Sequence, residues 1–281
     1  MDAQLEEIRD QQRQTWDTFS AGWKKWDALV QRWIAPVGEA LIQGARLGPA
    51  AQVLDIAAGT GEPGLTAASR VPAGKVVITD LSDAMLEVAA DNARQRGIEN
   101  VETRQCDAGA LPFGDNSFDA VMCRFGFMFF PDVRVSLDEM VRVAKPGARI
   151  CAAVWGAPEK NPWATTIMRT IAANVALPPA APGAPGLFRC AEPGLMARAY
   201  RQAGLGNVAE NEISGVVEFA DAAQYWTFMT EIAAPVVAGL TLADATTRDR
   251  IGQTVRDLAQ QATREGKVRF GWSAVTICGE R

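Results

Sequence analysis

Histidine is absent from the chain, and tyrosine and cysteine are scarce, with two and five residues. The absence of histidine excludes Ser-His-Asp and Cys-His hydrolysis, histidine-centred metal sites and dehydrogenases that rely on an imidazole acid. The odd number of cysteines and their scattered positions fit neither a metal site nor a disulfide framework. We therefore expect no metal and a reducing compartment, the cytoplasm. The cysteines are Cys106, Cys123, Cys151, Cys190 and Cys278.

Excess basic charge and membrane-spanning segments are also lacking. The formal net charge is -5, whereas binding to a phosphate backbone needs clustered Lys and Arg, so we expect no nucleic-acid partner. The first residues, MDAQLEEIRDQQRQ, lack the basic and apolar segments of a secretory signal. The uncharged stretch 170–188 is interrupted by LPPAAPGAPG, so we expect no integral membrane segment.

Hydrophobic residues make up 48% of the 281 residues, which is enough for one α/β domain with additions. Near the N-terminus, apolar side chains recur every three or four positions and would share one face of a helix. We expect residues 1–48 to form a helical segment that closes over the site, although core packing explains the same stripe. The stripe consists of Trp16, Phe19, Trp23, Trp26, Val30 and Trp33.

Short apolar strands alternate with helical patterns over residues 49–156. AQVLDIAAGTG indicates a buried strand that enters a glycine-rich turn, and KVVITDLS indicates a second strand, after which Ser82 caps a helix that Gly97 closes. VETRQCD, FDAVMCRF and ARICAAVW indicate three more strands. This alternation predicts a doubly wound, mostly parallel sheet, in which ligands bind beyond the carboxyl ends of the strands.

The alternation stops after Trp155. Helical patterns in NPWATTIMRTIAANVA, in AEPGLMARAYRQAG and between residues 221 and 265 surround two strand patterns, NVAENEISGVVEF and KVRFGWSAVTIC. LPPAAPGAPG is predicted to be a linker without regular structure. We expect residues 157–281 to supply the remaining core strands and a helical substrate cap, within a single domain.

The segment GTGEPG, residues 59–64, matches the GxGxxG spacing of dinucleotide-binding proteins. Asp80 lies 21 residues after Gly59, which suits the ribose of a dinucleotide and equally that of any other adenosine ligand. Asp55 distinguishes the two, because a carboxylate at the mouth of the loop repels a pyrophosphate and favours a ligand with a positive end. Gly64 then becomes an early helix residue without an assigned contact.

LDIAAGTGEPG resembles the first motif of class I S-adenosylmethionine-dependent methyltransferases, acid-x-Gly-x-Gly-x-Gly at the end of strand one. Ala57 departs from it at a position where glycine is commonest. VVITDLSDAML and QCDAGALPF resemble the second and third motifs. SFDAVMCRFGFMFF and VRVAKPGARI complete the order found in the ubiquinone and menaquinone biosynthesis methyltransferases, the methyltransferase type 11 group. The resemblance covers about residues 50 to 155.

The resemblance implies S-adenosylmethionine as cofactor and S-adenosylhomocysteine as product. It implies a Rossmann-like α/β fold with a doubly wound, seven-stranded sheet, an N-terminal helical segment and a helical cap before the last strand. Asp55 would lie near the cofactor ammonium, Asp80 would bind both ribose hydroxyls, and Asp107 would accept from the adenine amino group. The predicted cofactor residues are Asp55, Ala57, Gly59, Thr60, Gly61, Asp80, Leu81, Met85, Cys106, Asp107, Ala108, Arg124 and Trp23.

Each carboxylate also has a structural alternative. Asp55 could cap or turn the strand end, Asp80 could be a turn residue before Ser82, and Asp107 could be ordinary loop polarity. Arg124 lies where strand four should end and could anchor an acidic or quinol-like oxygen, contact the cofactor carboxylate or pair with a neighbouring acid.

Methyl transfer from a sulfonium mainly needs an aligned acceptor and the exclusion of water, so a general base is optional. Asp132 is expected to cap a helix, and we assign no catalytic residue. Methyltransferases that act on amide or nucleobase nitrogens usually carry Asn or Asp, Pro, Pro and an aromatic residue where this chain has CRFGFM. We expect a small apolar or aromatic acceptor, methylated at oxygen or carbon. Its expected contacts are Phe125, Phe127, Trp155 and Tyr225.

Two other functions remain open. A non-catalytic S-adenosylmethionine-binding protein would keep the same cofactor motifs. An NAD(P)-dependent oxidoreductase would need a hydride-site acid, and neither Tyr200 nor Tyr225 has a lysine four residues later, as the short-chain dehydrogenases do. A homodimer is a candidate assembly.

Overall fold

The chain folds around one mixed sheet, as a computed structural model shows for residues 3–179, 181 and 183–281. The strands follow the order β3-β2-β1-β4-β5-β8-β6, and the short β7 pairs with β8. In chain order the strands are β1 (Gln52–Ile56), β2 (Lys75–Asp80), β3 (Val101–Gln105), β4 (Phe118–Arg124), β5 (Ala144–Trp155), β6 (Gly206–Phe219), β7 (Thr263–Arg264) and β8 (Lys267–Glu280).

Strands β1 to β5 pair in parallel, whereas β8 runs antiparallel to β5 and to β6. The parallel strands β1, β2 and β4 are almost entirely buried, as expected for a sheet covered on both faces. β3 has the weakest strand pattern in the sequence because it lies at the edge and is largely exposed. The predicted doubly wound, mostly parallel fold is confirmed, and β7 is a two-residue addition to the seven expected strands.

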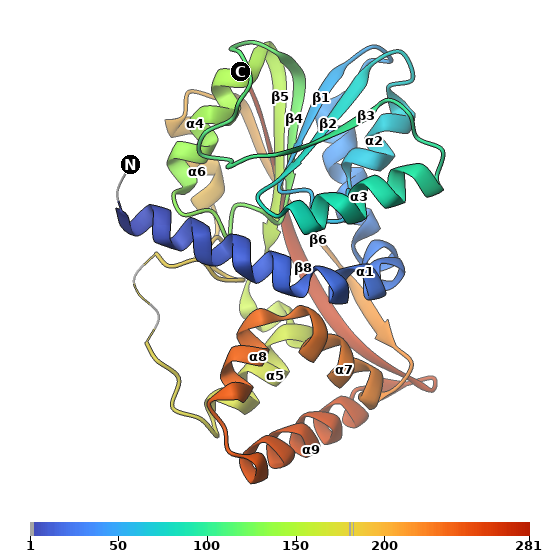
Figure 1. Cartoon of the computed structure of the whole chain (residues 1–281), viewed down its shortest axis with the longest axis vertical. Coiled ribbons are helices and arrows are strands. Elements are labelled where there is room, and N and C mark those ends of the chain that lie inside the picture. The colour runs from blue at the N-terminus through green and yellow to red at the C-terminus, as the bar shows by residue number, and fades with distance from the viewer. Residues whose placement is uncertain (1–2, 180, 182) are drawn as a thin grey trace.

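Helices cover both faces of this sheet and form a separate layer beyond it (Figure 1). None of the helices in the described ranges is long and apolar enough to cross a membrane. The helices are α1 (Ala3–Ala45), α2 (Gly64–Arg70), α3 (Asp83–Gln95), α4 (Val133–Val143), a 3-10 turn η1 (Pro158–Lys160), α5 (Pro162–Ala172), α6 (Leu195–Gln202), α7 (Ala222–Ile232), α8 (Ala234–Thr241) and α9 (Ala245–Gln261).

Helix α1 is the longest element, and it lies between the sheet and the helical layer formed by α5, α7, α8 and α9 (Figure 1). Its buried residues begin at Val30, and the part from there to Ala45 packs on β5 and β8. Its earlier part contacts α3 on one side and α7 on the other. The contact with α7 is close, because a side chain at Gly22 would overlap the carbonyl oxygen of Glu231.

Most of the expected elements after Trp155 are present, with α7 to α9 inserted between β6 and β8 as a helical cap. Within the predicted linker LPPAAPGAPG, residues 180 and 182 lie outside the described residues, and the others belong to no helix or strand. The local caps also agree with the sequence. Ser82 accepts a hydrogen bond from the Met85 amide, and Asp132 accepts from the amides of Arg134 and Val135.

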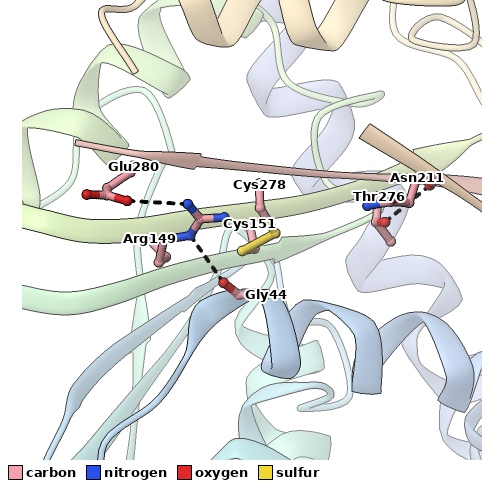
Figure 2. Close-up of a disulfide and its surroundings, with 7 residues drawn as sticks. All are labelled: Gly44, Arg149, Cys151, Asn211, Thr276, Cys278 and Glu280. Carbon is pink, nitrogen blue, oxygen red and sulfur yellow. Dashed lines mark hydrogen bonds and ion pairs between the residues drawn. A yellow bond between two sulfur atoms is a disulfide. The ribbon is translucent and has the colours of Figure 1, made fainter. Parts of the chain in front are cut away.

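The expectation that the cysteines form no disulfide is wrong for one pair. Cys151 and Cys278 form a disulfide between β5 and β8, with their Cα atoms 4.2 Å apart (Figure 2). The two residues are 127 positions apart in sequence but directly opposite each other in the antiparallel register. Sequence spacing could not predict the pair, because the pairing of remote strands places the two residues together. Cys106, Cys123 and Cys190 are free.

Candidate functional site

The glycine-rich loop leaves the carboxyl end of β1 and turns sharply. Ala57, Gly59 and Gly61 have positive φ angles of 53°, 55° and 110°. A left-handed conformation favours glycine, so the same geometry explains why glycine is common at the place that Ala57 occupies here. A Cβ at Gly59 would meet no atom within 4 Å, whereas at Gly61 it would lie 2.7 Å from Leu65. The loop therefore packs on α2 at Gly61 and leaves open space at Gly59.

Asp55, in β1 just before this loop, is fully buried. Its Oδ2 accepts a hydrogen bond of 2.6 Å from the Gly64 amide, and its Oδ1 has no partner among the described residues. Burial raises the pKa of Asp55 to about 8, while the charge of Arg124 and the Gly64 hydrogen bond act in the opposite direction. The carboxyl group thus holds the start of α2 with one oxygen and leaves the other unused.

Gly64 has the contact that the sequence did not assign. A Cβ there would lie 2.8 Å from Asp55 Oδ2 and 2.9 Å from Ile78 Cγ1. Only glycine lets α2 begin this close to β1 and β2. The signal in the sequence was the third glycine of GxGxxG, which serves helix packing here as it does in dinucleotide-binding folds.

Asp80, at the end of β2, joins the glycine loop to the start of α3. Its Oδ2 accepts from the Gly59 amide and its Oδ1 from the Ser82 amide, each at 2.9 Å. Burial raises its pKa, and these backbone hydrogen bonds lower it in part. Asp80 is therefore a turn residue in this structure. Each carboxylate oxygen has a second lone pair, so this role leaves acceptor capacity for a ribose.

The residues after β3 approach the same edge of the sheet, because the Cys106 amide donates to the Asp80 carbonyl at 3.0 Å. Asp107 accepts from the Gly109 amide at 2.8 Å, and its other oxygen lies 4.0 Å from Arg9. Ala108 is buried, and burial raises the pKa of the Cys106 thiol to about 11. The residues of the third motif thus lie beside Asp80, and Asp107 orders its own loop.

Arg124 ends β4 and points its guanidinium toward the glycine loop and α1. It donates to Gln31 at 3.4 Å, and a Cβ at Gly38 would lie 3.6 Å from its Nη1. Burial lowers the pKa of Arg124, and the nearby carboxyl groups of Glu62, Asp55 and Asp27 raise it. These three carboxyl groups and Arg124 place groups of both signs around the glycine loop.

Helix α1 contributes polar residues that the sequence did not reveal. Asp27 accepts from Thr60 Oγ1 at 2.6 Å, and Gln31 donates to the same hydroxyl at 3.2 Å. Asn92 of α3 donates to the Thr60 carbonyl at 2.9 Å, and Asp17 accepts from Ser82 at 2.5 Å. In the sequence, these residues are recognisable only as polar positions of amphipathic helices. Such positions look the same whether the side chain faces solvent or binds a partner.

Three further residues that the sequence predicted as cofactor contacts lie near the carboxyl ends of the parallel strands. Met85 is buried at the start of α3, and Leu81 is partly buried beside it. Trp23 of α1 has a buried indole nitrogen without a partner among the described residues. Its ring lies 6.0 Å from that of Trp16, which in turn meets Phe129 edge-on at 5.1 Å, so α1 reaches the loop after β4.

The four predicted acceptor contacts do not come together. Phe125 has a φ of 65° and stacks on Trp155 at 4.2 Å, next to the end of β4. Phe127 is fully buried and packs on Phe130 and Tyr200. Tyr225 is also fully buried in the helical layer. The Tyr225 hydroxyl donates to the Trp163 carbonyl at 2.7 Å. Phe125 and Trp155 border the site, whereas the other two rings belong to the packed interior.

A comparison with known protein families finds a match over residues 53–147 to the model of a methyltransferase domain. An uncharacterised protein of Mycobacterium tuberculosis is 37% identical over 140 residues, which are 49% of this chain and 50% of that protein. The ubiquinone/menaquinone biosynthesis C-methyltransferase of Idiomarina loihiensis is 48% identical over 101 residues, 35% of this chain and 40% of that enzyme. The chain thus spans about half the length, or less, of these relatives.

Among solved structures, the YcgJ protein from Bacillus subtilis has a TM-score of 0.55 at 22% identity, covering 87% of this chain and 97% of that one. This likeness concerns the fold, which extends well beyond the residues matched in sequence. Together the comparisons confirm the resemblance to S-adenosylmethionine-dependent methyltransferases and the Rossmann-like fold.

Proposed function

We propose that this chain, which contains an S-adenosylmethionine-dependent methyltransferase domain, transfers the cofactor's methyl group to a small, largely apolar or aromatic acceptor at oxygen or carbon. One observation carries the proposal. In β1, just before the glycine loop, a fully buried carboxyl group has an oxygen atom, Asp55 Oδ1, with no partner among the described residues. An ammonium group would supply the missing donor and charge.

The residues around Asp55 fit the rest of the cofactor. The open space at Gly59 would admit its methionine part. Asp80 would accept from the ribose hydroxyls while it keeps its two backbone donors. Leu81 and Met85 would border the adenine, and Asp107 would accept from its amino group. When bound, the cofactor supplies an activated methyl group on a positively charged sulfur.

The acceptor would lie between the end of β4 and α1. Phe125 and Trp155 offer stacked aromatic surface there, and Trp33 stacks on Trp155 at 5.5 Å. The indole nitrogens of Trp23 and Trp33 are buried without a partner among the described residues, so each can donate to an acceptor oxygen. An aromatic or quinol-like molecule combines the apolar surface and the oxygen atoms that this arrangement suits.

The protein's part in the reaction would be to orient the acceptor and exclude water. Asp132 caps α4, and the hydroxyl of Tyr225 is engaged by Trp163, so we assign neither as a base. Arg124 lies close enough to the loop to orient an acidic oxygen of the acceptor or the cofactor carboxylate. A cytoplasmic location and a homodimer stay predictions.

Radiolabelled S-adenosylmethionine incubated with quinols, phenols, fatty acids and thiols tests the proposal. We expect label in an aromatic or quinol-like product, and less label with Phe125→Ala, which removes the half-buried ring that stacks on Trp155. Binding of S-adenosylhomocysteine without transfer to any acceptor class would favour the non-catalytic alternative. Binding of NAD in place of S-adenosylhomocysteine would overturn the cofactor assignment.

A further inference from the structure

The Cys151–Cys278 disulfide lies next to Gly44, near the C-terminal end of α1, and involves none of the residues assigned above (Figure 2). A Cβ at Gly44 would overlap Cys278 Sγ and lie 3.1 Å from Cys151 Sγ. Arg149 donates to the Gly44 carbonyl at 3.3 Å and pairs with Glu280 at 3.6 Å. The helix therefore rests directly on the two sulfur atoms.

A hollow of about 380 Å³ opens beside this contact. It lies in the size range of sites that take small molecules. Cys278 lines the hollow and is half-buried, whereas Cys151 is fully buried and does not line it. A molecule in the hollow can thus reach only one of the two sulfur atoms. The lining residues are Ala40, Gln43, Gly44, Arg46, Arg149, Ala209, Asn211, Ile213, Thr276 and Cys278.

The charge of this lining is positive, although the whole chain carries a net charge of -5. Arg46 and Arg149 contribute two guanidinium groups, of which that of Arg149 is paired with Glu280, and no carboxylate is among the lining residues. Arg46 is exposed, whereas only 11% of the Arg149 side chain is accessible. A negatively charged molecule is therefore favoured beside Arg46.

We propose that this hollow is a thiol-exchange site, at which a small anionic thiol attacks the disulfide at Cys278. The thiolate forms a bond to Cys278 Sγ, the bond between Cys278 and Cys151 breaks, and its electron pair leaves as the Cys151 thiolate, which then takes a proton from solvent. A second thiol attacks the mixed disulfide at the sulfur of the first. This releases the oxidised dimer of the small thiol and leaves Cys278 reduced.

The position of α1 links this chemistry to the rest of the molecule. The backbone of Gly44 lies so close to Cys278 that a Cβ there would overlap the sulfur atom, so a thiol attached to this sulfur changes the contact on which α1 rests. The adduct therefore loosens the end of α1 at residues 37–45. The exchange site is separate from the proposed methyl transfer, and its test requires no cofactor.

The test compares reduced glutathione, an anionic thiol, with cysteamine, a cationic thiol. Mixed disulfides are trapped with iodoacetamide and located by peptide mass mapping, and each rate is divided by the rate of that thiol with a small neutral disulfide. We expect the adduct on Cys278, a corrected rate about tenfold higher for glutathione, and faster hydrogen exchange in residues 37–45 of the adduct. Arg46→Gln should lower the glutathione preference at least about threefold. Arg32→Gln, exposed on the same helix and outside the hollow, should leave it unchanged.

Three results would overturn the exchange site, and a fourth would overturn its link to α1. Titration of five free thiols in unfolded, unreduced protein would show that the disulfide is absent. An adduct on Cys151, or a corrected rate for cysteamine equal to that for glutathione, would remove the role of the hollow. Unchanged hydrogen exchange in residues 37–45 of the adduct would contradict the link between the disulfide and α1. The free residues Cys106, Cys123 and Cys190 report on non-specific modification in each experiment.

Discussion

Asp55 combines two roles that its surroundings make compatible. One oxygen fixes the Gly64 amide, so the start of α2 cannot move away from β1. The other oxygen is buried without a partner among the described residues, so the ionised form is disfavoured until a donor arrives. A structural cap and a ligand contact were alternatives in the sequence, and the geometry allows both because a carboxyl group has two oxygens.

The raised pKa of Asp55 predicts how stability depends on pH. Its pKa is about 8 in the folded chain against an ordinary 3.8, so the native state retains a proton that the unfolded state loses. This contribution to stability is complete below about pH 4 and is lost as pH rises through about 8. Asp55→Asn should remove this dependence. Between about pH 4 and 9, the free energy of unfolding of the wild-type should therefore fall by about 2–4 kcal/mol more than that of Asp55→Asn.

Urea unfolding of both proteins across this pH range measures the effect. Asp138→Asn, at an exposed ion pair with Arg134, is the matched control and should follow the wild-type. Parallel pH profiles for wild-type and Asp55→Asn would show that Asp55 is ionised in the native state.

Gly64 predicts a cost of close packing. Gly64→Ala places a methyl group within 3 Å of Asp55 Oδ2 and Ile78 Cγ1, and overpacking of a tight interior typically costs about 1–3 kcal/mol. We expect this loss in the free energy of unfolding, measured with urea. Gly271→Ala, where a Cβ meets nothing within 4 Å, should change stability little. Equal effects of both substitutions would contradict the packing argument.

At the scale of elements, α1 connects three parts of the molecule. It meets the glycine loop through Asp27 and Thr60, α7 through Lys25 and Glu231, and the disulfide through Gly44. A helix held at several points along its length can transmit a displacement, and these contacts join segments that are far apart in sequence. Its periodicity predicted the helix, but periodicity does not reveal which polar residues find partners.

Thr60→Val tests the contact of α1 with the loop. It removes a hydrogen bond to Asp27 while it keeps the size of the side chain, so we expect a loss of about 1 kcal/mol in affinity for S-adenosylhomocysteine. Hydrogen exchange in residues 17–31 should also become faster. The control is Thr18→Val on the same helix, because within the part of the chain that the structure describes the Thr18 hydroxyl bonds only to the Gln14 carbonyl one turn earlier. Identical behaviour of the two variants would mean that α1 is not held by Thr60.

For the whole molecule, the sequence predicts which residues lie together at the ends of the parallel strands. It predicts few of the contacts that form when elements far apart in the sequence pack together. Asp55, Gly59 and Asp80 converge because their strands end at one edge of the sheet, so spacing alone placed them together. The Cys151–Cys278 pair and the Asp27–Thr60 contact depend on how β8 and α1 dock, which no local pattern encodes. Aromatic residues are equally ambiguous, because Phe127 and Phe125 differ in environment but not in local sequence character.

The central claim is that the buried Asp55 carboxyl receives the ammonium group of the cofactor, and calorimetric titration with S-adenosylhomocysteine tests it most directly. The titration is carried out near pH 7 in buffers of different ionisation enthalpy, with wild-type and Asp55→Asn proteins. The account predicts that the wild-type releases close to one proton on binding, and that Asp55→Asn binds about 1–3 kcal/mol more weakly without proton release. Equal affinity and equal proton release in the two proteins would contradict it.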